Sequence, residues 1–286
     1  MRISAPAKIN LNLRIHGKRD DGFHEIETLM LPVDLADEME IERVESGIHL
    51  TCDDPSLLCG PGNLVHDAAT AFFRATGSVG GVRIHLTKRI PSGAGLGGGS
   101  SDAAATLLAL NALFSAGMDA SRLEALAASL GSDVPWFVQA RPAVCRGRGE
   151  VIESVEPPPP AQFLLLKPPF GIPTPWAYGA WSGGGPWPTA VVAAHRHGGH
   201  AIFNDFEEPV FRKYPLLGIL KAWLAAAPGV LASGMSGSGS TLFALLSNEA
   251  EPCALAEEVR SFGGETLGVW HVQSPPDPAA SRPGAF

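Results

Sequence analysis

Hydrophobic positions near the start of the chain alternate with polar ones, as in a strand with one buried face. Apolar residues occupy every second position over residues 9–15, with asparagine or arginine between them. This period of two predicts a half-buried strand. A charged turn over residues 17–22 and an apolar run over residues 23–31 predict that the chain returns as a neighbouring strand. Three more segments have strand character, at residues 39–44, 48–52 and 82–86.

Helical periodicity appears in the first half of the chain. Asn63 precedes apolar residues spaced three or four apart and Gly77 follows them, which predicts a capped helix between the two. The Ala/Leu-rich segment 101–114 predicts a buried helix. Ser121 and Glu124 have the spacing of a capping box, so we expect the next helix to begin there.

A run of four prolines, residues 157–160, marks the middle of the chain. Before it, Asp133 with Pro135 predicts one more helix start, and strands are expected around Val144 and Val151. Consecutive prolines favour a stiff extended connector rather than a helix or a central strand. We therefore predict two domains, residues 1–156 and 161–286.

The second half of the chain has the pattern of a split β-α-β unit. Strands and helices are expected in the order strand, helix, strand, strand, helix, strand, at residues 163–167, 215–226, 230–232, 241–246, 250–262 and 267–272. This order is typical of a ferredoxin-like fold. A Gly/Trp/His-rich insert at residues 181–200 interrupts it, and we assign that insert no role. Its histidines, His195, His197 and His200, lack acidic or cysteine partners, so we expect a solvated loop rather than a metal site.

Composition limits the classes of function. The 286 residues are 45% hydrophobic, and their formal net charge is −8. An acidic chain is unsuited to nucleic acid, and a small anionic substrate would need a local positive site against that background. Four scattered cysteines, no apolar leader and no apolar run long enough for a bilayer favour a cytoplasmic protein that binds no membrane. We expect a monomer or weak homodimer.

The most informative segment is glycine-rich and runs over residues 91–102, between a strand and a helix. Glycines let the backbone approach an anion, and the free N–H groups of a helix start favour phosphate. A side chain at Gly97 is expected to occupy the space that the phosphates need. Two other phosphate motifs fit less well. Gly93 to Gly98 matches the dinucleotide fingerprint, but its acidic partner, Asp119, opens a helix instead of ending a strand, and the Walker lysine is missing.

Three segments together resemble the GHMP kinase superfamily: residues 6–11, 91–101 and 233–241. Further matches, at residues 7–13, 21–25, 95–104, 131–135 and 204–207, resemble the branch that phosphorylates a hydroxyl of cytidine-diphosphate-linked methylerythritol in isoprenoid precursor synthesis. The resemblance implies an α+β fold with an N-terminal α/β domain that carries additional antiparallel strands and a C-terminal ferredoxin-like domain. It places the active site in the cleft between them.

The resemblance also implies the phosphoryl-transfer residues. Lys8 and Asp133 would meet beside the substrate hydroxyl, where Asp133 accepts the proton late and Lys8 stabilises developing charge. A plain helix cap is the alternative for Asp133, and a solvated strand lysine for Lys8. ATP is the expected donor, with Mg²⁺ on its phosphates. The residues predicted to bind ATP are Pro91, Gly93, Ala94, Gly95, Leu96, Gly97, Gly98, Gly99, Ser100 and Ser101. Gly237, Ser238 and Gly239 would support the phosphate site.

A cytosine pocket is the most specific implication. Phe23 and Tyr178 would sandwich the base and His24 would read its edge, with Asn10 and Thr174 also touching substrate. The family usually has tyrosine at the position of Phe23. Core packing is the alternative for each ring. A kinase of another small alcohol, of the homoserine or mevalonate type, and a non-catalytic nucleotide-binding protein remain as other hypotheses.

Overall fold

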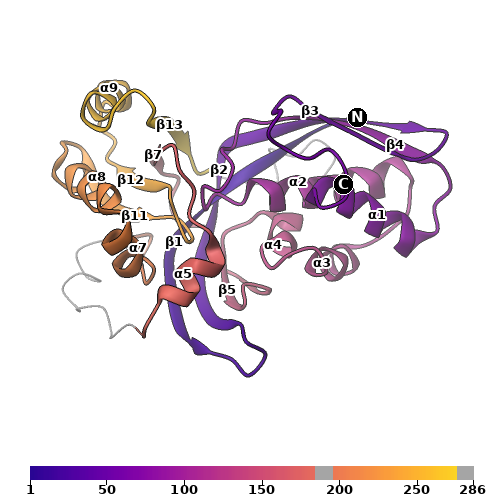
Figure 1. Cartoon of the computed structure of the whole chain (residues 1–286), viewed down its shortest axis with the longest axis horizontal. Coiled ribbons are helices and arrows are strands. Elements are labelled where there is room, and N and C mark those ends of the chain that lie inside the picture. The colour runs from indigo at the N-terminus through magenta and orange to yellow at the C-terminus, as the bar shows by residue number, and fades with distance from the viewer. Residues whose placement is uncertain (184–195, 276–286) are drawn as a thin grey trace.

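Two sheets form the centre of the molecule, and helices cover the outer face of each. The computed structural model describes residues 1–183 and 196–275 (Figure 1). The larger sheet has the strand order β10-β1-β2-β4-β3, with β5 paired to β2 and β6 paired to β5. Its strands are Arg2–Lys18 (β1), His24–Val44 (β2), Ile48–Cys52 (β3), Gly81–Thr87 (β4), Ala143–Gly147 (β5), Val151–Ser154 (β6) and Phe203–Asn204 (β10).

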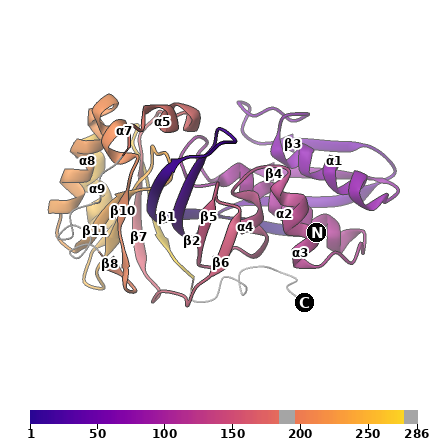
Figure 2. The same cartoon turned by 90° about the horizontal axis from the view of Figure 1, so that it is seen from below.

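Four helices lie on one face of this sheet (Figures 1 and 2). They are Leu64–Thr76 (α1), Gly98–Leu113 (α2), Ala120–Ala128 (α3) and Val134–Gln139 (α4). The predicted caps of α1 are confirmed, because the Asn63 side chain accepts from the Val65 N–H and Gly77 is left-handed. The predicted capping box of α3 is wrong: Asp119 lies two residues earlier and accepts from the Arg122 N–H at 2.9 Å.

The second sheet is the predicted ferredoxin-like unit. Its strand order is β11-β12-β7-β13 and all its pairs are antiparallel. The strands are Gln162–Lys167 (β7), Val230–Met235 (β11), Leu242–Leu246 (β12) and Gly268–Gln273 (β13), and the covering helices are Pro215–Ala226 (α8) and Pro252–Gly263 (α9). In chain order the strands run 2-3-1-4 across the sheet, as the β-α-β-β-α-β pattern requires.

Five short elements between β7 and α8 were not expected from the sequence, namely Thr174–Ala180 (α5), Arg196–His197 (β8), His200–Ala201 (β9), β10 and Glu207–Lys213 (α7). The two helices, α5 and α7, lie where a loop was predicted, and β8 pairs with β9. Both helices have only seven residues, too few for a visible apolar period. His195 and residues 184–194 of the insert lie outside the described residues.

The two sheets pack face to face because alternate residues of their strands are apolar on the shared side. Ile9 and Leu11 of β1 meet Phe163 and Leu165 of β7 in one buried cluster. A register shift between Asn10 and Asn12 is a bulge in β1. Beyond it, Leu13 and Ile15 join the core under α7 and α8 instead. The strand expected to be half-exposed is therefore buried on both faces over residues 7–11, and its polar residues Lys8 and Asn10 face a cavity between the two halves.

Candidate functional site

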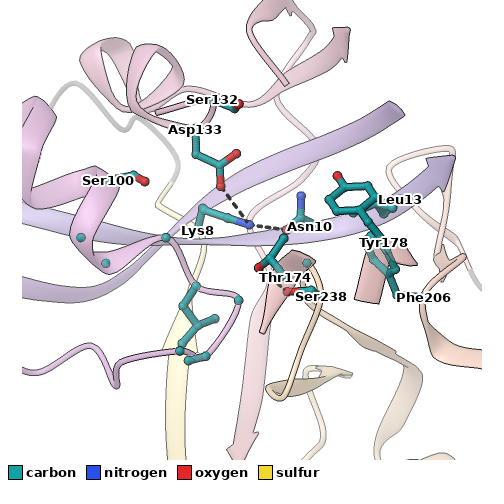
Figure 3. A pocket seen from close by; sticks show the side chains of 18 of the residues that line it. Lys8, Asn10, Leu13, Ser100, Ser132, Asp133, Thr174, Tyr178, Phe206 and Ser238 are labelled. Carbon is teal, nitrogen blue, oxygen red and sulfur yellow. Dashed lines mark hydrogen bonds and ion pairs between the residues drawn. The ribbon is translucent and has the colours of Figure 1, made fainter. Parts of the chain in front are cut away.

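One cavity of about 930 Å³ lies between the two halves of the molecule. Its wall comes from β1, the turn before β2, the glycine loop, the start of α4, helix α5 and the loop after β11. Eighteen of the twenty side chains and glycines predicted for the site line it: Lys8, Asn10, Phe23, His24, Pro91, Gly93, Ala94, Gly95, Leu96, Gly97, Gly98, Gly99, Ser100, Asp133, Thr174, Tyr178, Gly237 and Ser238. Figure 3 shows the part around Lys8.

Lys8 and Asp133 meet at the centre of the cavity, as expected. The Lys8 Nζ lies 3.7 Å from the Asp133 Oδ2 and donates a short hydrogen bond to the Asn10 Oδ1 (Figure 3). The Lys8 side chain is buried, whereas that of Asp133 is 32% exposed. Burial lowers the pKa of Lys8, and the Asp133 carboxylate opposes that effect. The pair therefore combines a Lys8 ammonium that is shielded from solvent with an Asp133 carboxylate that solvent can reach.

Asp133 occupies the N-cap position of α4 but does not cap it. Its side chain makes no hydrogen bond to the helix backbone. Pro135 stands at the start of the helix and lacks an N–H, so one donor that a cap would satisfy is missing. The carboxylate is therefore directed at Lys8 and the cavity, which disfavours the simple capping interpretation.

Ser236 fastens the glycine loop, β1 and the C-terminal half to one another. Its hydroxyl accepts from the Asn10 N–H at 3.1 Å and donates to the Gly95 carbonyl at 2.9 Å. Asn204 holds the adjacent loop by donating to the Met235 and Gly237 carbonyls, at 2.6 and 2.8 Å. Sequence reasoning missed Ser236, although it lies within the third glycine segment that it singled out.

The glycine loop has left-handed backbone at Gly93, Gly95 and Gly97, which favours glycine. The reason expected for Gly97 is corrected by the structure. A Cβ there would lie 2.7 Å from the Phe137 ring, so a side chain would collide with α4 rather than enter the phosphate space. We therefore expect substitution of Gly97 to disturb the fold as well as any ligand.

Two predicted residues lie outside the cavity wall. Ser101 is buried in the first turn of α2, and its hydroxyl has no hydrogen-bond partner in the described parts of the chain. Gly239 packs against Met235 and Ile172. Ser238 lines the cavity, and its hydroxyl lies 2.9 Å from that of Thr174 (Figure 3). The loop around residue 238 is thus tied to helix α5.

Aromatic rings form the other end of the cavity. His24 stacks on Tyr178, with ring centroids 4.8 Å apart and planes inclined by 19°. Phe23 is 50% exposed, and the Arg148 guanidinium carbon lies 4.6 Å from its ring centroid. Burial and the nearby Lys18 lower the pKa of His24, which favours a neutral ring that can donate and accept. Burial and Asp133 raise the pKa of Tyr178 to about 12, so its hydroxyl remains a donor.

Lys88 also lines the cavity, and sequence reasoning did not single it out. Its Nζ pairs with two buried carboxylates, Asp37 by a short contact and Asp102 at 2.8 Å. Asp37 also accepts from the backbone N–H groups of Arg89 and Ile90, at 2.6 and 2.8 Å. These contacts tie the entry of the glycine loop to helix α2. No local pattern could have revealed them, because Asp37 and Lys88 are 51 positions apart.

Family comparison agrees with this arrangement. Residues 63–141 match the GHMP kinases N terminal domain, and residues 192–265 match the GHMP kinases C terminal domain. Among the described residues, no helix is both long and apolar enough to cross a bilayer.

Individual relatives are similar over most of the chain. A 4-diphosphocytidyl-2-C-methyl-D-erythritol kinase from Methylacidiphilum infernorum is 44% identical, with 86% of each chain covered. The enzyme of the same name from Thermus thermophilus is 42% identical, and the match covers 93% of this chain and 94% of that one. A crystal structure of 4-(cytidine 5'-diphospho)-2C-methyl-D-erythritol kinase superposes with a TM-score of 0.80 at 38% identity, covering 96% of this chain and all of that one. The chain therefore belongs to the 4-diphosphocytidyl-2-C-methyl-D-erythritol kinase family of GHMP kinases and is a small-molecule kinase.

Proposed function

We propose that this kinase transfers the γ-phosphoryl group of ATP to the 2-hydroxyl of 4-diphosphocytidyl-2-C-methyl-D-erythritol. The observation that carries the proposal is the order of groups along one cavity. The glycine loop and the Lys8–Asp133 pair occupy one part, and the Phe23, His24 and Tyr178 rings occupy another. A substrate with a reacting alcohol at one end and a base at the other suits that order.

Asp133 orients the substrate hydroxyl and accepts its proton as the bond to phosphorus forms. The partly exposed carboxylate can reach an alcohol in the cavity, and the loose transition state of phosphoryl transfer needs the proton removed only late. Lys8 stabilises the negative charge that develops on the transferred group, because its ammonium has little water to screen it. Asn10 fixes the ammonium through its short hydrogen bond.

The glycine loop binds the phosphates of ATP. Left-handed glycines turn its backbone, and helix α2 begins directly behind it at Gly98. The free N–H groups of that helix start and its partial positive charge favour an anion. Gly237 and Ser238 close the opposite wall.

Magnesium fits this site as an ion that arrives with ATP. Residues 1–183 and 196–275 hold no group of three or more His, Cys, Asp or Glu side chains able to hold a metal. Mg²⁺ commonly keeps waters and takes one or two protein oxygens besides substrate phosphates. The Ser100 hydroxyl and the Asp133 carboxylate line the cavity and could supply them. When bound, the ion neutralises charge on the β- and γ-phosphates.

The remaining expectations form part of the same proposal. The boundary between residues 1–156 and 161–286 is supported by the separate sheets on either side of the prolines, although β10 crosses back to the first sheet. The net charge of −8 disfavours nucleic acid as a partner. The four scattered cysteines favour the cytoplasm. We expect a monomer or weak homodimer.

A coupled ADP-release assay tests the substrate. The wild type should phosphorylate the cytidylyl compound and prefer it strongly over homoserine, mevalonate and the methylerythritol phosphate that lacks cytidine. Phe23→Ala should raise the KM for the cytidylyl compound by about 5- to 150-fold, since one stacked base contributes about 1–3 kcal/mol. The KM for ATP should not change.

Phe262→Ala is the matched control, because Phe262 is 51% exposed and stacks on Trp223 far from the cavity wall. Equal activity of the wild type on the compound without cytidine would refute the base pocket. Preference for homoserine or mevalonate would establish the alternative kinase.

A further inference from the structure

The cavity carries fewer available positive charges than its composition suggests. Four cationic side chains line it within the described residues, namely Lys8, Lys18, Lys88 and Arg148. Lys8 contacts Asp133 and Asn10 and is already assigned to the transferred phosphoryl group. Lys88 is held between two buried carboxylates. Of these four, Lys18 and Arg148 remain to meet a further anion.

Arg148 is weakly paired and only partly exposed. Its Nε lies 4.0 Å from the Glu150 Oε1, at the limit of an ion pair. Glu150 is occupied by the turn itself, because its Oε2 accepts from the Arg148 backbone N–H at 2.6 Å. The arginine side chain is 35% exposed. Its guanidinium can therefore turn toward a ligand without breaking a strong contact.

Arg148 lies between the Asp133 end and the aromatic end of the cavity. It lies in the turn between β5 and β6. The next residue, Gly149, packs against the Asp133 carboxylate, since a Cβ there would lie 3.6 Å from the Asp133 Oδ1. The guanidinium reaches the other way and lies 4.6 Å from the Phe23 ring centroid. The side chain thus spans the space between the reacting end and the base end.

A diphosphate in that space would need a cation. The proposed substrate carries its diphosphate between the sugar alcohol and the cytidine, so the group must pass between Asp133 and the rings. Asp133 would repel it, and the chain as a whole has a net charge of −8. A guanidinium offers a planar fork of donors that matches phosphate oxygens, whereas the exposed Lys18 is a solvated point charge.

We propose that the Arg148 guanidinium binds the diphosphate of the cytidylyl substrate and makes the enzyme selective for diphosphate-linked alcohols, an inference that rests on the proposed function. The guanidinium lies over the Phe23 ring, which keeps it next to the base end of the cavity, while base stacking itself depends on the rings. Arg148 is a specificity-determining residue in this arrangement and takes no part in proton transfer.

The experiment compares cytidine with cytidine 5'-diphosphate by isothermal titration, with the glycine loop saturated by a non-hydrolysable ATP analogue. In the wild type the diphosphate should tighten binding about 10- to 100-fold, the range of a charge-assisted bidentate contact. Arg148→Met should remove most of that gain and leave cytidine binding within about 3-fold. Arg148→Lys should recover part of it. The KM for the cytidylyl substrate should follow the same order, with the KM for ATP unchanged.

Arg146→Met is the matched control. Arg146 lies two residues away on β5, pairs with Glu27 and Glu153, and is absent from the cavity wall. It should leave both affinities unchanged, and melting curves should show all variants folded. Arg148 is wrongly assigned if Arg148→Met keeps the diphosphate gain, if Lys18→Met abolishes it instead, or if the KM for ATP rises. Failure of the wild type to bind cytidine or to use the cytidylyl substrate would overturn the proposed function itself.

Discussion

A buried lysine, Lys8, and a half-buried one, Lys88, line the same cavity, and their surroundings give them opposite properties. Lys8 has one carboxylate at 3.7 Å, and burial lowers its pKa. Lys88 lies between Asp37 and Asp102. Burial also acts to lower the pKa of Lys88, but the two carboxylates outweigh it, and the net effect is a raised pKa.

The difference separates a charge used for chemistry from a charge used for structure. A cation held between two buried carboxylates has no free electrostatic field to offer, and removing it leaves unpaired buried charge. A buried cation with one solvent-facing carboxylate can stabilise charge that appears only in the transition state. We therefore expect substitutions at the Lys8 site to affect turnover and those at the Lys88 site to affect folding.

The largest effect should come from Asp133→Asn. The variant should bind an ATP analogue normally but lower kcat by about 10²- to 10⁴-fold, the range for a lost general base. Single-turnover kinetics would separate the chemical step from product release. Near-normal turnover would place the carboxylate outside the reaction.

Lys88→Met should lower the free energy of unfolding by about 3–5 kcal/mol, because Asp37 and Asp102 lose their shared cation. Urea unfolding followed by circular dichroism measures this. The double variant Lys88→Met/Asp102→Asn should recover part of the loss, since one carboxylate is removed with the cation. A stable but inactive Lys88→Met would instead make Lys88 a functional cation and break the comparison.

Lys8→Met should show the reverse pattern. We expect kcat to fall about 10²- to 10³-fold, as for loss of one charge-stabilising donor. The melting temperature should stay the same or rise, because a desolvated charge disappears and the 32% exposed Asp133 keeps its contact with water. Paired kinetic and calorimetric data check this, and a large fall in melting temperature would contradict it.

The smallest effect should be a pH dependence at Asp102. Burial, partly offset by Lys88, raises the pKa of Asp102 to about 7 from an ordinary 3.8. The folded chain therefore holds a proton that the unfolded chain releases, so this contribution to stability is present below about pH 4 and lost as pH rises through 7. The unfolding free energy of Asp102→Asn should gain on that of the wild type as pH rises from about 4 to about 7, by about 1 kcal/mol or about 2–4 °C in Tm for each pH unit, and should gain nothing further above that range. Parallel melting curves of the two proteins would contradict the assignment.

Local patterns predicted those elements whose determinants are neighbours in sequence. The caps Asn63 and Gly77 bound α1, and the order of strands and helices after the prolines forms the ferredoxin-like sheet. Helices α5 and α7 escaped prediction because seven residues do not show an apolar period. The two strands predicted within residues 23–44 are one long strand, β2, which continues through a bulge between Val33 and Ala36.

The sequence by itself determined the glycine loop, the identity of Lys8 and Asp133, and the aromatic residues of the cavity, because short motifs carry them. Only the tertiary structure decided how they act together. Ser236 reaches Asn10 across 226 positions, and the Phe137 ring leaves no room for a side chain at Gly97. Lys88 is fixed by Asp37, and Arg148 lies over Phe23. Such contacts depend on where distant strands bring side chains after packing. The partner of a charged or aromatic side chain is defined only when packing of the core fixes the position of that side chain.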